Sequence, residues 1–298
     1  MGFVKRIRRG AVCVSARLLT AGLNVVGRRL AMFWGAMIGL AAWRLASRDR
    51  YKSLRHLSLV YGNELSFDRR RRIARDFFIN IGKNLADVLR FPRHFASELK
   101  PLVAVEGLEH FDAAYRRGRG LIGITGHIGN FELLAVYIAS LGYDIAVIGR
   151  EMYDPRLNEL LVKNREALGL INIATTDSPR RVLEWLRKGG AVGALIDTDS
   201  IRVRSTFVPV FGRPALTPIG QSIIGLRAGS AFVPLACVRT SDNRYRIIIK
   251  PEVSIEPSGD FSKDVEHVTA RCTAVLEGII NEYRDQWIWL KNRWLTAP

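Results

Sequence analysis

The sequence predicts an α/β domain, a central mixed sheet flanked by helices, that follows a basic and apolar N-terminal segment. Two observations carry this prediction. From about residue 103, short aliphatic and β-branched runs alternate with stretches of helical periodicity, a pattern typical of a sheet covered by helices. Before residue 50, two apolar runs lie among arginines, which favours helices at a membrane surface.

Positive charge is concentrated in the first hundred residues. The 298-residue chain carries a net charge of +17, and residues 1–100 hold 21 Lys and Arg against 6 Asp and Glu. A basic excess beside the most apolar stretches indicates attraction to an anionic bilayer. Nucleic acid is the competing partner, but we expect none, because the basic residues flank apolar runs such as 30–43 and are not interleaved with exposed aromatics.

The N-terminal segment predicts a membrane anchor at residues 1–50, followed by a catalytic domain at 51–298. An apolar stretch at 10–27 is broken by Arg17, and an uncharged stretch covers 30–43. Each is shorter than the roughly 20 apolar residues that span a bilayer, which favours interfacial helices with arginines reaching the headgroups. One tilted span over 18–43 and a cleaved signal peptide are the alternatives.

An amphipathic helix is predicted over residues 67–91. Its apolar residues, from Ile73 to Leu89, recur every three or four positions. We expect Pro92 to end this helix.

The following region alternates strands with helices. The predicted strands are 120–125, 145–148, 171–174, 191–196, 232–238 and 245–249. The predicted helices are 131–140, 154–168, 178–188, 218–228 and 264–283. The tail carries Trp287, Trp289 and Trp294 beside Lys291 and Arg293, which suits either a membrane interface or core packing.

The segment from His127 to Glu132 is the candidate catalytic site. His127 follows a predicted strand, at the sheet edge where α/β proteins place ligands. A histidine there can take a proton from an attacking hydroxyl, and a carboxylate such as Glu132 can orient the ring. On a regular helix the two side chains would point about 140° apart, so the pairing needs the loop that Gly129 and Asn130 permit.

Backbone N–H groups at the start of the following helix are available to a carbonyl oxygen that gains negative charge during acyl transfer. This chemistry needs no metal and no cofactor. The three cysteines, Cys13, Cys237 and Cys272, are widely separated, so we expect neither a zinc site nor a disulfide framework.

Several separated motifs resemble the lipid A biosynthesis acyltransferase family, which is related to phosphatidylinositol-mannoside acyltransferases. The segment 126–132 is similar to the family's His-x4-Asp/Glu signature. Thr198 stands where the family usually has glutamine. The other similar segments are Gly149-Arg150, the Arg165 element at 164–169, Asp197-Thr198-Asp199, the Phe-Val-Pro stretch at 207–215, and the tryptophan-rich tail.

The resemblance implies a fold like that of glycerolipid acyltransferases, an acyl carrier protein thioester as donor, and a lipid A precursor as acceptor. A phosphatidylinositol-mannoside-like lipid is the alternative acceptor. It implies His127 as general base, Glu132 as its partner, and a catalytic domain on the cytoplasmic face of the inner membrane. The candidate substrate-binding residues are Asn130, Arg150, Arg165, Asp197 and Asp199.

Two other classes of function compete. The turn at 125–129 loosely resembles a dinucleotide-binding loop, but its spacing differs from Gly-x-Gly-x-x-Gly, and Asp144 begins its strand where a ribose-binding acid would end one. A non-catalytic basic protein that binds membranes is the second alternative.

Overall fold

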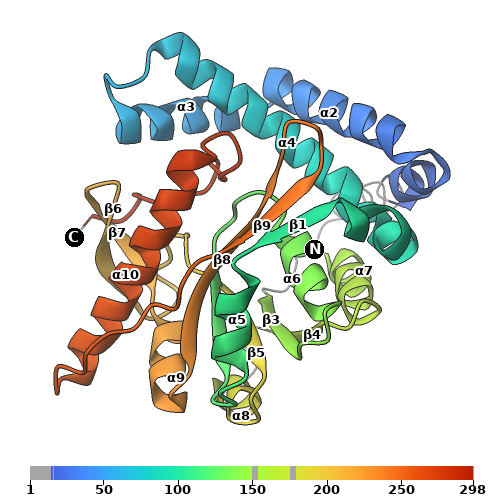
Figure 1. The fold of residues 1–298 in the computed structure, drawn as a ribbon. Helices are drawn as coiled ribbons and strands as arrows, with labels where there is room; N and C mark the ends of the chain where they lie inside the picture. Colours follow the sequence, from blue (N-terminus) through green and yellow to red (C-terminus); the bar gives the residue numbers. More distant parts are fainter. Residues whose placement is uncertain (1–14, 16, 150–153, 175–178, 298) are drawn as a thin grey trace, which may run out of the picture.

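A seven-stranded mixed sheet forms the centre of the computed structural model, which describes residues 15, 17–149, 154–174 and 179–297. Its strands are β1 (Val103–Glu106), β2 (Leu121–Thr125), β3 (Ile145–Gly149), β4 (Ile171–Ala174), β5 (Ala191–Leu195), β8 (Ala231–Arg239) and β9 (Tyr245–Ile249). They lie in the order β1-β9-β8-β2-β5-β3-β4, and only β8 and β9 pair antiparallel (Figure 1). The predicted α/β class with a mixed sheet is confirmed.

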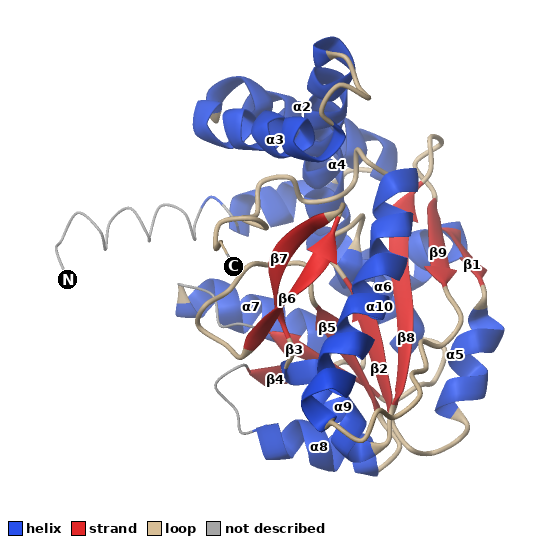
Figure 2. Cartoon of the chain, turned by 90° about the vertical axis from the view of Figure 1, so that its left-hand side faces the viewer, coloured by secondary structure: helices blue, strands red, loops and turns tan. Residues whose placement is uncertain are grey.

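Helices cover both faces of the sheet. One face packs on α5 (Leu108–Tyr115) and α6 (Phe131–Ala139), and the other on α8 (Pro179–Arg187), α9 (Gly220–Ala228) and α10 (Phe261–Glu282), with α7 (Pro155–Glu166) beside β4 (Figure 2). The central strands β2 and β8 are buried along their whole length. Such continuous apolar strands are expected where both faces are covered.

An antiparallel hairpin lies outside the main sheet. It consists of β6 (Ser205–Val210) and β7 (Arg213–Pro218) and packs against α10. The turn places Phe211 at a φ of 49°, and its backbone N–H donates to Glu277 Oε2 at 2.5 Å. These two strands were not among those predicted from the sequence.

Three N-terminal helices form a layer across the top of the sheet in Figure 1: α2 (Arg28–Leu45), α3 (Ser47–Tyr61) and α4 (Phe67–His94). Three glycines let α2 and α4 approach closely. A Cβ at Gly35 would lie 2.7 Å from the carbonyl oxygen of Gly82, and one at Gly39 would overlap the carbonyl of Phe78. The absence of side chains therefore sets the spacing of this helix pair.

Within the described residues, no single helix has both the length and the apolar composition to cross a bilayer. Among the helices that the structure describes, only α2 and α3 taken together satisfy that test, and they bend by 88° where they join.

The amphipathic helix predicted over 67–91 is confirmed as α4, but the prediction that Pro92 ends it is wrong. The helix continues to His94 and passes into a π-helical turn, Phe95–Leu99. Pro92 lies in the last turn, where its ring removes one hydrogen bond and leaves the preceding turns intact. At the other end, Ser66 Oγ accepts from the backbone N–H of Arg69 at 3.3 Å.

We predict that Gly82→Ala destabilises the protein, because the added methyl would overlap the carbonyl of Gly35. Such overpacking costs about 1–3 kcal/mol, more than the roughly 1 kcal/mol that alanine gains over glycine in a helix. Thermal unfolding followed by circular dichroism should show a lower Tm. The control is Gly278→Ala on α10, where the methyl meets nothing within 4 Å. A Tm at or above wild type for Gly82→Ala would contradict the packing described.

Candidate active site

His127 lies in the loop that joins β2 to α6, at the carboxyl edge of the parallel strands. Backbone contacts fix this loop. The N–H of Gly129 donates to Gln286 O at 2.9 Å, and that of Asn130 donates to Cys237 O at 2.8 Å. Gly129 has a φ of 56°, and a Cβ there would overlap the carbonyl of Cys237, so glycine is required at this position.

Asp197 is the carboxylate that holds His127. Its Oδ1 lies 2.7 Å from His127 Nδ1, and its Oδ2 accepts from the backbone N–H of His127 at 2.7 Å and from Trp287 Nε1 at 2.8 Å. The contact follows from the register of two strands, because Thr125 of β2 pairs with Leu195 of β5. His127 and Asp197 each lie two residues after these paired positions, so the register brings them side by side.

Asp197 is held in its charged form. Burial alone would raise its pKa, but the charge and hydrogen bonds of His127, together with the Trp287 indole, lower that pKa to about 2. An ionised carboxylate accepts hydrogen bonds only, so Nδ1 of His127 carries the proton. The Nε2 atom has no hydrogen-bond partner among the described residues, and in the neutral ring it carries the lone pair that a general base needs.

Glu132 forms a different pair. It lies on the first turn of α6, and its Oε1 and Oε2 accept from Arg165 Nη2 at 2.6 Å and Nε at 3.0 Å. Arg165 also donates from Nη1 to Asn172 Oδ1 at 2.8 Å. The expected contact between Glu132 and His127 is therefore corrected: the helix turns Glu132 toward Arg165, and Asp197 bonds the ring. A catalytic role for Glu132 stays a prediction.

The remaining predicted residues have structural contacts or lie outside the described residues. Asn130 is buried; its Oδ1 caps α6 by accepting from Leu133 N at 3.1 Å, and its Nδ2 donates to the hydroxyl of Tyr245 at 3.1 Å. Asp199 accepts hydrogen bonds from the backbone and side chain of the tail residue Thr296. Arg150 lies outside the described residues. A role of Asn130 or Asp199 in binding substrate stays a prediction.

A buried polar network behind the loop was not predicted. Asp87 of α4 accepts from Tyr245 Oη at 2.6 Å and from Arg239 Nη2 at 3.1 Å. Burial raises the pKa of Tyr245 well above its ordinary value, so the phenol stays protonated. Asn84, also on α4, donates to the carbonyl of Gly129 at 2.8 Å. No sequence motif marks these residues, which only the fold brings together.

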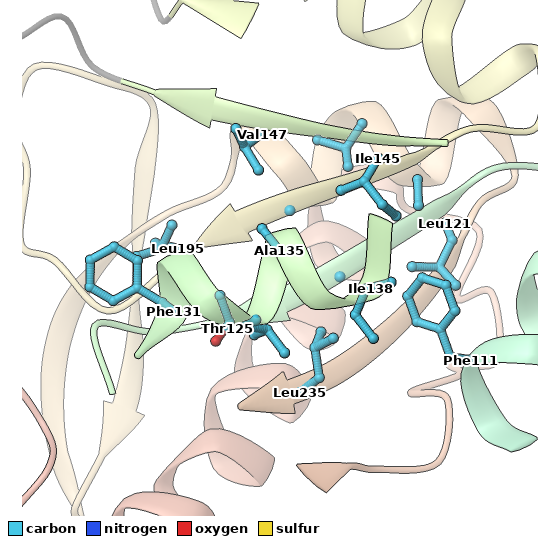
Figure 3. Close-up of a pocket in the computed structure, with 15 residues that line it drawn as sticks. Phe111, Leu121, Thr125, Phe131, Ala135, Ile138, Ile145, Val147, Leu195 and Leu235 are labelled. Carbon is cyan, nitrogen blue, oxygen red and sulfur yellow. The ribbon is translucent and has the colours of Figure 1, made fainter. Parts of the chain in front are cut away.

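An apolar slot runs beneath α6, between that helix and the sheet (Figure 3). Its free volume is about 60 Å³. Thr125 and Phe131 lie at one end and Phe111 at the other, and the Phe131 ring contacts the His127 ring at 5.2 Å between centroids. Gly123 of β2 pairs with Gly193 of β5, and both line the slot. Because glycine has no side chain, these two positions leave the space between the sheet and α6 open.

The described residues contain no cluster of three His, Cys, Asp or Glu side chains placed to hold a metal ion. The arrangement offers a base, its carboxylate partner and an apolar slot. At the start of α6, the N–H groups of Phe131 and Glu132 have no partner within the described residues, whereas Leu133 N bonds Asn130. Free N–H groups at a helix start can bind a negatively charged oxygen.

Comparison with known proteins assigns this α/β protein, with its histidine–carboxylate pair and apolar slot, to a family. The family model described as bacterial lipid A biosynthesis acyltransferase matches residues 9–296. The chain belongs to this family, and the resemblance noted in its motifs is confirmed.

Individual relatives agree with this assignment. The lipid A biosynthesis lauroyltransferase of Escherichia coli (strain K12) is 26% identical over 270 residues, which cover 89% of this chain and 85% of that protein. The lipid A biosynthesis myristoyltransferase of the same strain is 24% identical over 259 residues, 86% of this chain and 78% of that protein.

The match to mycobacterial relatives is shorter. A phosphatidylinositol mannoside acyltransferase of Mycobacterium tuberculosis (strain CDC 1551 / Oshkosh) is 24% identical over 164 residues, 52% of this chain and 51% of that protein. The chain therefore spans about half the length of that relative.

Proposed function

We propose that this protein transfers a fatty acyl chain from an acyl carrier protein thioester to a hydroxyl of a membrane glycolipid, with a lipid A precursor as the acceptor. The contact between His127 Nδ1 and Asp197 Oδ1, which leaves Nε2 available as a base, carries this proposal. The names of the Escherichia coli relatives support a lipid A precursor as acceptor, and the mycobacterial relative supports a phosphatidylinositol mannoside as the alternative.

In the proposed reaction, His127 Nε2 takes the proton of the acceptor hydroxyl as its oxygen attacks the thioester carbonyl carbon. Asp197 stabilises the imidazolium that forms. The carbonyl oxygen gains negative charge near the start of α6, where the N–H groups of Phe131 and Glu132 can bind it. When the carbon–sulfur bond breaks, the same proton passes to the leaving thiolate, which balances the transfer.

In this mechanism, Glu132 acts through Arg165. Both side chains are largely buried, with 16% and 14% of their surfaces exposed, and their two hydrogen bonds form a bidentate pair. The pair ties the first turn of α6 to α7 and therefore positions the loop that carries His127.

We assign the apolar slot to the acyl chain, whose entry requires the side chains that line the present space of about 60 Å³ to move apart. Phe131, at one end of the slot, lies against the His127 ring, and the lining of the slot is almost entirely aliphatic or aromatic. Each methylene removed from water contributes ~0.8 kcal/mol, so such a lining favours a fatty chain over a polar group. At the same end, Thr125 Oγ1 is buried without a partner among the described residues.

The N-terminal layer would seat the protein on the cytoplasmic face of the inner membrane. Helix α2 exposes large apolar side chains that include Phe33 at 55% and Trp34 at 51%. Arg28 and Arg29 begin this helix and Arg44 lies in its last turn. Exposed apolar side chains between arginines suit the interface of an anionic membrane. Net positive charge also suits an acidic carrier protein.

We predict that His127→Ala lowers acyl transfer by roughly 10²–10⁴-fold. Asp197→Asn should lower it by about 10²-fold or more, because the amide cannot hold the imidazolium as a carboxylate does. Glu132→Gln should lower it less than Asp197→Asn does. The measurement is mass spectrometry of purified acceptor lipid after reaction with an acyl carrier protein thioester, in which product gains one acyl mass.

Circular dichroism of each variant serves as the control for folding, and a mannosylated phosphatidylinositol tests the alternative acceptor. Near wild-type transfer by Asp197→Asn together with complete loss in Glu132→Gln would return the carboxylate role to Glu132. Undiminished transfer by His127→Ala would remove the proposed base.

We predict that Gly193→Val shifts the preferred donor toward shorter acyl chains. A Cβ at Gly193 would meet its nearest neighbour, Val147 Cγ1, at 3.6 Å, so a side chain fits there but fills the slot. The measurement is the relative kcat/KM for donors of increasing chain length. Gly220→Ala is the control, since its methyl meets nothing within 4 Å. An unchanged chain-length profile in Gly193→Val would show that the acyl chain binds elsewhere.

A further inference from the structure

A groove of about 660 Å³ lies where α2, α3 and α4 meet. These three helices lie at the top of Figure 1. Four arginines from these helices surround an apolar floor that includes Trp43 and Leu54. The arginines are Arg44, Arg50, Arg71 and Arg75, and we call this groove the arginine pocket. It is lined by other residues than the slot beneath α6 and takes no part in the proposed transfer step.

One arginine of the pocket is held in place by the protein itself. Arg50 Nη1 donates to the carbonyls of Trp43 at 2.9 Å and Arg44 at 3.0 Å, and its guanidinium lies 5.6 Å from the centre of the Trp43 ring. These bonds use a single nitrogen, so the rest of the fork stays available to a ligand. A guanidinium fixed in this way loses little freedom when it binds an anion.

The positive charge of the pocket is poorly compensated. Arg75 pairs with Asp76 at 2.8 Å, but the guanidinium groups of Arg44 and Arg71 have no hydrogen bond or ion pair within the described part of the chain. Both residues are exposed. Like charges gathered around one groove repel each other, and a bound anion relieves that repulsion.

The surroundings of the pocket indicate where that anion comes from. Arg44 stands on α2, the helix that exposes Phe33 and Trp34, and the rim of the pocket carries Phe67, which is 59% exposed. Apolar and aromatic side chains beside arginines are typical of the headgroup level of a bilayer. When α2 lies in the interface, the pocket would face the layer of lipid phosphates.

We infer that the arginine pocket binds the phosphate of an anionic membrane lipid, with the guanidinium groups of Arg44, Arg50 and Arg71 as donors. Guanidinium forks bind phosphate oxygens in a bidentate manner. The inference rests on the proposed binding of α2 at the membrane surface. It adds a specific lipid contact to the general attraction between a basic protein and an anionic bilayer.

The test is binding of the full-length protein to vesicles, measured by co-sedimentation. Neutral vesicles contain phosphatidylcholine, and anionic vesicles also contain phosphatidylglycerol. Arg44→Gln/Arg71→Gln should weaken binding to anionic vesicles by roughly 30-fold, since each arginine near an anionic surface strengthens binding by roughly fivefold. Binding to neutral vesicles should not change. The matched control is Arg48→Gln/Arg55→Gln, which removes the same charge from exposed positions of α3.

A conservative variant separates a built site from diffuse attraction. Arg44→Lys/Arg71→Lys keeps the charge but loses the planar guanidinium groups. We therefore expect this variant to lose most of the selectivity for anionic vesicles. Full selectivity for anionic vesicles in this variant, or an equal loss of binding in the control pair, would overturn the phosphate site. The proposed binding of α2 at the membrane surface would still stand.

Other outcomes would give the arginine pocket a different ligand or would contradict the proposed binding of α2 at the membrane. If inorganic phosphate changes the tryptophan fluorescence of the wild-type protein and not that of the Gln pair, without any vesicle selectivity, the pocket binds a soluble phosphate and the lipid assignment fails. If the Gln pair raises KM for the acyl carrier protein thioester with vesicle binding unchanged, the pocket is a carrier-protein surface. A wild-type protein that binds neither kind of vesicle would overturn the proposed membrane seat itself.

Discussion

The buried carboxylate of Asp197 is the contact on which the site depends. It receives hydrogen bonds from the ring and backbone of His127 and from the indole of Trp287, and so joins β5, the loop after β2 and the C-terminal tail. The tail adds a second hold on the loop, because Ile288 N donates to His127 O at 3.0 Å. Arg293, buried nearby, has its pKa lowered to about 10 by burial, although Asp197 and Asp199 oppose that shift.

The fold class and the place of the site could be predicted from the sequence. The spacing of apolar residues indicates strands and helices, and the position of His127 after a strand indicates the site. Buried strands read as continuous apolar runs, and His127 follows one of them. The partner of His127 could not be chosen in this way. Glu132 is nearer in sequence, but Asp197 is brought to the ring by the register of β2 with β5, which is a property of the folded sheet.

Other differences have similar causes. Pro92 does not stop α4, because a proline in a last turn disrupts little. The sequence left open whether the tail tryptophans lie at a membrane interface or pack in the core. For two of the three the structure shows core packing, since Trp287 and Trp289 are 2% and 0% exposed. The polar network of Asp87, Arg239 and Tyr245 joins α4 to the loop. Arg28 of α2 joins the same network through Asp87 at 3.0 Å, so the layer proposed to sit on the membrane is bonded to the site.

The most direct test concerns the proton on His127. The chain has five histidines, and ¹⁵N NMR of histidine-labelled protein, with His127→Gln to assign the signal, reports which ring nitrogen carries hydrogen at neutral pH. When the His127 ring is neutral, its contact with the Asp197 carboxylate through Nδ1 selects the Nδ1–H tautomer with an unprotonated Nε2, and Asp197→Asn should abolish that preference. An Nε2–H tautomer in the wild-type protein would contradict the proposed base and the role assigned to Asp197.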